Sequence, residues 1–247
     1  MLQETLIYHV GSLKCLGALF TQEKTLRPLI LVAPAFRGQD EFAREKACYL
    51  AELGYAALAL DIYGEGKTVT TNEEASALMQ PLFLDRKELR RRMIAALEAV
   101  RTLPWVDTAR LGAIGFCFGG LAVLELLRAG APLKGVVSFH GLLGDKLGDK
   151  IAKLEPTQPI QGALLILDGA EDPLVPWRDL ENLKKEMTDA GADWEIDIYG
   201  HTVHAFTNPE VHDKKTGLAY NEKIARRAFQ KMELFFRETM QSVDQPS

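Results

Sequence analysis

Gly115-Phe116-Cys117-Phe118-Gly119-Gly120 is the stretch that decides the fold, and it lies between two apolar runs, 111–114 and 121–127. The first run has the length of a buried strand, and the second has helical spacing. A strand that turns sharply into a helix around G-x-C-x-G is typical of a nucleophile elbow, here with cysteine where serine is commoner. Gly115 and Gly119 would allow the close backbone approach of so tight a turn. We therefore expect an α/β fold with the Cys117 sulfur exposed at a helix N-terminus, where the helix dipole favours the thiolate.

An acid and a histidine follow two later strands. The apolar run 163–167 is predicted to be a buried strand, and D-G-A-E-D-P-L-V-P follows it at 168–176. Residues 194–199 predict another strand, which leads into G-H-T-V-H-A-F at 200–206. Nucleophile, acid and histidine thus occur in the chain order of the α/β-hydrolase fold. The acid and the histidine each follow a predicted strand, where open α/β sheets place their ligands.

These motifs resemble those of the dienelactone hydrolase family, a branch of the α/β-hydrolases with a Cys-Asp-His triad. The match rests on G-F-C-F-G-G, G-A-E-D-P-L-V-P and H-A-F, in the family's order and at similar spacing. The resemblance covers essentially the whole chain. It implies a single α/β-hydrolase domain over 1–247, with a mostly parallel central sheet and helices on both faces, and this length suits one domain.

The resemblance implies a catalytic triad of Cys117, Asp172 and His204. In such a triad the cysteine attacks an acyl carbon and forms a thioester, while the histidine transfers protons. The aspartate holds the imidazole in the useful tautomer and stabilises its charged form.

Two of these assignments have rivals nearby in the sequence. His201 lies three residues before His204, but the family's histidine directly precedes a small residue and a phenylalanine, which favours His204. Asp168 and Glu171 compete with Asp172, and the family's D-x-x-V-P pattern favours Asp172. We expect His201 to be a polar loop or pocket residue and Asp168 to hydrogen-bond within its turn.

An oxyanion hole needs backbone N–H groups that are already aimed at the developing charge. In this fold one donor is the residue after the nucleophile, here Phe118. The family match assigns the second to Phe36, with Ala35 as the alternative because the register is uncertain by about one residue. Pro34 has no N–H to donate.

Two departures from the family concern the substrate. Ala35 stands where dienelactone hydrolases carry a glutamate that activates the thiol, and neither 75–76 nor 207–209 supplies the arginines that bind the lactone carboxylate. Arg37 could supply a positive charge or could be a surface residue. These departures predict neutral substrates.

The expected function is hydrolysis of neutral, small to medium carboxylic esters or lactones through a cysteine thioester. The predicted substrate pocket includes Ala35, Arg37, His140 and Phe206, with His140 equally interpretable as a buried structural histidine. One alternative is metal-free hydrolysis of other activated esters, such as phosphotriesters. Another is a non-hydrolytic thiol sensor on the same fold.

Composition limits the partners and the compartment. The chain has 247 residues and a net charge of −5, which argues against nucleic acid and anionic membranes as partners. The start lacks a signal-peptide pattern, and no apolar run has the length of a membrane span. The three cysteines are widely spaced, which favours neither disulfides nor a metal site. We expect a cytoplasmic enzyme without metal or cofactor; the sequence leaves its oligomeric state open.

Overall fold

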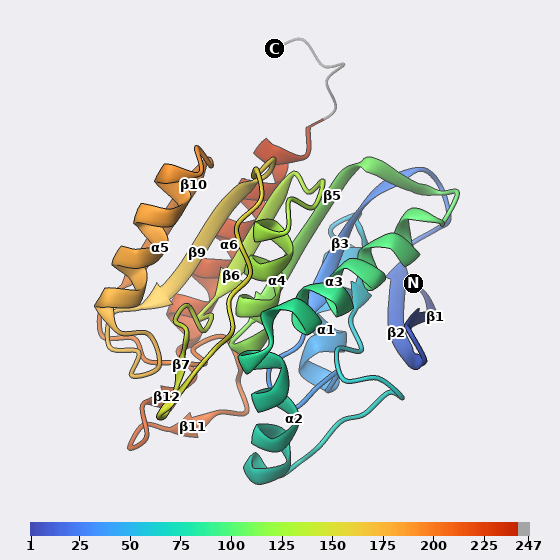
Figure 1. Ribbon diagram of the computed structural model, residues 1–247. Coiled ribbons are helices and arrows are strands. Elements are labelled where there is room, and N and C mark those ends of the chain that lie inside the picture. The colour runs from blue at the N-terminus through green and yellow to red at the C-terminus, as the bar shows by residue number, and fades with distance from the viewer. Residues whose placement is uncertain (242–247) are drawn as a thin grey trace.

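The computed structural model describes residues 1–241, and its centre is an eight-stranded sheet in the order β1-β2-β4-β3-β5-β6-β9-β10 (Figure 1). β1 and β2 form an antiparallel hairpin, β2 is also antiparallel to β4, and the other neighbouring pairs are parallel. The mostly parallel sheet predicted from the sequence is therefore confirmed. The strands of this sheet are β1 (Leu2–Val10), β2 (Leu13–Thr21), β3 (Arg27–Ala33), β4 (Ala56–Ala59), β5 (Val106–Phe116), β6 (Gly135–Phe139), β9 (Ala163–Gly169) and β10 (Trp194–Tyr199).

Helices cover both faces of the sheet, as predicted (Figure 1). Buried residues of α3, α4 and α5 share one hydrophobic core with one face, and those of α1 and α6 share a second core with the other. Because both faces are buried, the central parallel strands are almost continuously apolar. The helices are α1 (Glu41–Glu52), α2 (Asn72–Leu84), α3 (Arg86–Arg101), α4 (Phe118–Arg128), α5 (Trp177–Asp189) and α6 (Glu222–Thr239).

Side-chain caps fix the starts of several helices. Asp40 caps α1 by accepting a hydrogen bond from the Ala43 N–H at 3.1 Å, and Asp85 caps α3 in the same way. Asn221 caps α6. Such caps pair N–H groups that have no acceptor within the helix, which places the helix starts where the sequence has Asp or Asn.

Helix α2 and four very short strands are not predicted from the sequence. Pro81 lies within α2, and proline is unfavourable inside a helix because it lacks an N–H and crowds the preceding turn. The short strands pair as two hairpins, β7–β8 and β11–β12, near the carboxyl ends of the parallel strands, at the lower edge of Figure 1. Two-residue strands are too short to show a periodic pattern. Their bounds are β7 (Lys146–Leu147), β8 (Lys150–Ile151), β11 (His212–Asp213) and β12 (Leu218–Ala219).

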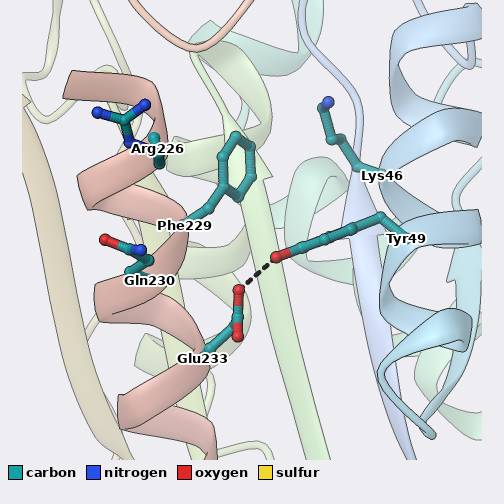
Figure 2. A pocket seen from close by; sticks show the side chains of 6 residues that line it. All are labelled: Lys46, Tyr49, Arg226, Phe229, Gln230 and Glu233. Carbon is teal, nitrogen blue, oxygen red and sulfur yellow. Dashed lines mark hydrogen bonds between the residues drawn. The ribbon is translucent and has the colours of Figure 1, made fainter. Parts of the chain in front are cut away.

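A groove of about 360 Å³ lies between α1 and α6 (Figure 2). The Tyr49 hydroxyl donates a hydrogen bond across it to Glu233, and the Phe229 ring lies in its wall. None of the candidate catalytic residues lines this groove. Within residues 1–241, no helix combines the length and the apolar character needed to cross a lipid bilayer.

Candidate active site

Cys117 occupies a strained turn between β5 and α4. Its φ is +55° and its ψ is −115°, a conformation that side-chain-bearing residues rarely adopt. A Cβ atom on Gly115 would lie 2.0 Å from the Gly119 carbonyl oxygen, and one on Gly119 would lie 2.1 Å from the Ala33 carbonyl oxygen. The expected need for glycine at both positions is confirmed.

Hydrogen bonds to two neighbouring segments fix the backbone of Cys117. Its N–H donates to the Phe139 carbonyl at the end of β6, and its carbonyl accepts from the Leu142 N–H at 3.2 Å. The residue is partly exposed at the N-terminus of α4. The turn therefore presents the sulfur at the sheet's carboxyl edge, at the positive end of a helix.

Asp172 and His204 form a buried pair. His204 Nδ1 lies 2.7 Å from Asp172 Oδ2, and the two side chains are 1% and 0% exposed. The second carboxylate oxygen, Oδ1, accepts from the Leu174 N–H at 2.8 Å. Because Nδ1 donates to the carboxylate, Nε2 is the ring nitrogen left for proton transfer.

The β11–β12 hairpin holds the backbone of His204. The His204 N–H donates to the Gly217 carbonyl, and the His204 carbonyl accepts from the Ala219 N–H, both at 3.0 Å. Gly217 has a φ of +78°, which glycine adopts at little cost. The sequence pattern contains no signal for this support, since the hairpin is too short to be periodic and becomes a partner of His204 only in the folded chain.

The surroundings of His204 favour its charged form. Burial opposes the charge, but the neighbouring Cys117 sulfur and the hydrogen bond to Asp172 outweigh it and raise the pKa of His204 to about 10. The Nε2 atom makes no hydrogen bond within ordinary limits. The Cys117 sulfur nevertheless lies close enough to raise the pKa of the imidazole.

The rival residues lie in other environments. The His201 side chain is 98% exposed, and its Nδ1 lies 3.0 Å from a carboxylate oxygen of Glu171. These two rival residues therefore pair with each other. Asp168 is fully buried, and its Oδ1 accepts from the Gly169 N–H at 2.9 Å, the local turn bond expected for it. Burial, together with the adjacent charge of Asp172, raises the pKa of Asp168 well above its usual range.

The N–H groups of Phe36 and Phe118 are both unpaired within the part of the chain that the structure describes. Within residues 1–241, neither donates a hydrogen bond to another protein group. Phe118 is the first residue of α4, while Phe36 lies in the turn that follows β3, where the Gly38 N–H bonds to the Ala35 carbonyl at 3.1 Å. Two unpaired donors on separate segments match the requirement for an oxyanion site.

Two residues expected in the pocket, His140 and Phe206, are buried near His204. His140 is 2% exposed, its ring centroid lies 5.0 Å from that of His204, and its Nε2 lies 2.8 Å from the Thr207 hydroxyl. Phe206 is fully buried, with its ring centroid 5.1 Å from that of His140. Both side chains are buried in this structure, and their assignment to the substrate pocket stays a prediction.

His140 is a buried histidine whose ring contacts that of His204. Burial and the neighbouring charge of His204 lower the pKa of His140 well below its ordinary value, so it packs against His204 as a neutral ring. The other two expected pocket residues lie on the turn after β3. Ala35 is partly exposed, whereas Arg37 is exposed and donates to the Asn72 side chain at 3.1 Å. Within residues 1–241, no cluster of three or more His, Cys, Asp or Glu side chains is placed to hold a metal ion.

Known proteins share this architecture. The model of the dienelactone hydrolase family matches residues 16–240. A crystal structure of a dienelactone hydrolase-like promiscuous phosphotriesterase from metagenomic libraries is 34% identical with a TM-score of 0.89, covering 97% of this chain and 99% of that one. A "Probable 2-oxo-3-(5-oxofuran-2-ylidene)propanoate lactonase" from Bradyrhizobium sp. is 30% identical, covering 72% of this chain and 73% of its own. A carboxymethylenebutenolidase from Pseudomonas putida is 26% identical, covering 62% of this chain and 64% of its own.

Proposed function

The chain belongs to the dienelactone hydrolase family, and we propose that it hydrolyses carboxylic esters or lactones through a covalent thioester on Cys117. The observation that carries this proposal is the buried Asp172–His204 pair beside Cys117. Cys117 lies in a strained elbow, and its sulfur raises the pKa of His204. The relatives named as a lactonase and a carboxymethylenebutenolidase support the same class of reaction.

Acylation begins with the Cys117 sulfur as thiolate and His204 as imidazolium. The sulfur attacks the acyl carbon, and the carbonyl electron pair moves onto oxygen, where the Phe36 and Phe118 N–H groups stabilise it. The tetrahedral intermediate collapses to the thioester, and the bond to the leaving alkoxide breaks. His204 gives its Nε2 proton to that oxygen, so an alcohol departs.

Deacylation uses the same groups in reverse. The now neutral Nε2 of His204 takes a proton from water as the water oxygen attacks the thioester carbon. The second oxyanion collapses, the carbon–sulfur bond breaks, and the carboxylic acid leaves. Cys117 returns as thiolate beside an imidazolium that Asp172 stabilises, which restores the starting state.

We propose neutral acyl groups of small to medium size as the substrates. Arg37 is the cation on the oxyanion turn, but it is exposed and bonded to Asn72, and the segment after His204 contains Thr207, whose hydroxyl is occupied by His140. A substrate carboxylate would have to give up its hydration without a buried cationic partner, which costs free energy.

Steady-state kinetics on matched substrates test this specificity. The experiment compares p-nitrophenyl butyrate with the p-nitrophenyl monoester of succinate, which differs by a terminal carboxylate. We expect a kcat/KM at least about tenfold higher for the neutral ester. A preference for the charged ester would overturn the neutral-substrate proposal while leaving ester hydrolysis intact.

Phosphotriester hydrolysis is a second candidate activity, favoured by the 34% identical neighbour described as a promiscuous phosphotriesterase. The thiolate would attack phosphorus, expel an activated phenolate and leave a phosphorylated sulfur for water to cleave. We expect paraoxon turnover to survive a chelator and to vanish in Cys117→Ala. Turnover that a chelator abolishes, or that Cys117→Ala retains, would contradict this route.

We also propose that the protein works in the reducing cytoplasm. All three cysteines, Cys15, Cys48 and Cys117, are free thiols in the structure. A working thiolate is readily oxidised, so a reducing compartment keeps it active.

A further inference from the structure

Tyr63, four residues after β4, touches both residues whose N–H groups form the proposed oxyanion hole. Its hydroxyl donates a hydrogen bond to the Phe36 carbonyl at 2.8 Å. Its ring stacks on the Phe118 ring, with centroids 6.4 Å apart and planes inclined by 7°. The side chain is only 7% exposed, so these contacts fix its position.

We infer that Tyr63 is a positioning residue that holds the two halves of the oxyanion hole at their working separation. The inference rests on the proposed function, since it concerns the same acyl-transfer site. Phe36 follows β3 and Phe118 begins α4, so the two donors belong to separate segments. Tyr63 joins these segments through one hydrogen bond and one ring contact.

The residues after Tyr63 secure the same turn at further points. The Val69 N–H donates to the Arg37 carbonyl at 3.1 Å, and Thr68 pairs with Gly38 as an antiparallel bridge. Gly38 has a φ of +87°, and a Cβ there would lie 2.5 Å from the Lys67 carbonyl oxygen. The oxyanion turn is thus held along its length by the segment that Tyr63 begins.

The backbone of Tyr63 is itself anchored from two directions. Asp61, 1% exposed, accepts hydrogen bonds from the Gly64 and Gly66 N–H groups at 2.8 and 2.7 Å. An Arg92 guanidinium N–H from α3 reaches the Tyr63 carbonyl at 3.3 Å. Because its backbone is fixed on both sides, Tyr63 can hold Phe36 and Phe118, the two residues that it contacts, in place.

Tyr63 stays a neutral donor while the nucleophile is charged. Burial raises the pKa of Tyr63 above its ordinary value, and the nearby Cys117 sulfur raises it further. Its hydroxyl therefore keeps its proton, and its bond to Phe36, over the pH range in which the thiolate reacts.

The test uses Tyr63→Phe, which keeps the ring stack and removes only the hydroxyl. Removing an oxyanion donor outright costs about 10²–10³ in rate, so a displaced donor should lower the acylation rate by about tenfold. The acylation rate is measured by stopped-flow release of p-nitrophenol from p-nitrophenyl butyrate. Affinity for an aryl trifluoromethyl ketone, whose thiol adduct carries the same oxyanion, should fall by the same factor.

Alkylation of Cys117 by iodoacetamide separates positioning from a change in the thiolate. This displacement at saturated carbon forms no oxyanion, so its rate in Tyr63→Phe should stay within about twofold of wild type. Tyr49→Phe is the matched control, because it removes a tyrosine hydroxyl bond to Glu233 in the distant α1–α6 groove (Figure 2). It should change none of the three readouts.

Each outcome bears on the inference. An unchanged acylation rate in folded Tyr63→Phe overturns it, and so does an alkylation rate that falls as much as acylation. If Tyr63→Phe does not fold, Phe118→Leu decides, since it removes the other contact but keeps the N–H. Full acylation and ketone affinity in that variant would overturn the inference. A wild-type protein without ester turnover would overturn the proposed function, and the role of Tyr63 with it.

Discussion

Asp172→Asn is the substitution that most sharply tests how the site holds its charge. Asp172 is buried and bonded to His204 Nδ1 at 2.7 Å, and its other oxygen is occupied by a backbone N–H. An amide at this position is nearly isosteric but neutral. It leaves the imidazolium without its carboxylate and can donate to Nδ1, which favours the tautomer with the proton on the wrong nitrogen.

The raised pKa of His204 indicates how strongly the site favours the imidazolium. The pKa of His204 rises from 6.5 to about 10, which corresponds to about 5 kcal/mol in favour of the imidazolium. Cys117 and Asp172 are the groups that raise it, against burial. Because Asp172 is one of these groups, and its replacement by Asn also favours the wrong tautomer, acylation should slow by at least about 30-fold.

The assay is stopped-flow acylation of wild type and variant by p-nitrophenyl butyrate, with iodoacetamide alkylation followed across pH. We expect acylation to fall by at least about 30-fold and alkylation of the variant at neutral pH to fall as well. Asp168→Asn is the matched control. Burial and the adjacent charge of Asp172 raise the pKa of Asp168 and so favour its uncharged form, and we expect Asp168→Asn to retain at least about a third of wild-type activity. An Asp172→Asn variant that acylates as fast as Asp168→Asn would refute the reasoning.

The remaining predictions concern stability. Gly119→Ala should prevent folding or lower the free energy of unfolding by more than about 3 kcal/mol, because its Cβ would lie 2.1 Å from a backbone oxygen. Gly200→Ala is the control, since its Cβ would have nothing within 4 Å and should change the urea midpoint little. Equal urea midpoints for the two variants would contradict the packing of the elbow. Glu125 is 1% exposed and pairs with two arginines, so Glu125→Gln should lower the free energy of unfolding in urea by about 3 kcal/mol. A loss under about 1 kcal/mol would contradict a stabilising role for these buried ion pairs. His204 binds a proton in the folded state that the unfolded chain loses above pH 6.5, so its contribution is complete below that pH and disappears as pH rises through about 10. Asp172→Asn removes a carboxylate that raises this pKa, so over this interval its melting temperature should fall less than that of wild type, and parallel curves would contradict the coupling.

The elbow is predictable from sequence because its chemistry leaves few choices of residue. Gly115 and Gly119 are required by backbone atoms within 2.1 Å of where a Cβ would lie, so the physical constraint appears directly as a sequence pattern. The alternating strands and helices are equally visible, since burial on both sides of a parallel sheet makes its strands continuously apolar.

Side-chain surroundings in the folded site are much less predictable. Phe206 and His140 follow strands at the correct edge of the sheet, but whether they face a substrate or the core depends on packing against other elements. Tyr63 carries no motif of its own, and its contacts with Phe36 and Phe118 are made across 27 and 55 positions of sequence. Such contacts exist only after the sheet has assembled.

Trapping the acyl-enzyme tests the central claim most directly. The protein is mixed with p-nitrophenyl butyrate, quenched in acid during the burst and analysed by intact and peptide mass spectrometry beside Cys117→Ala. We predict a p-nitrophenol burst equal to the enzyme concentration, steady turnover after it, and one butyryl group on the peptide that contains Cys117, all absent from the variant. Turnover that persists in Cys117→Ala, or an acyl group on another residue, would contradict the account. A stoichiometric burst without turnover would show a reactive thiol that is not a hydrolase.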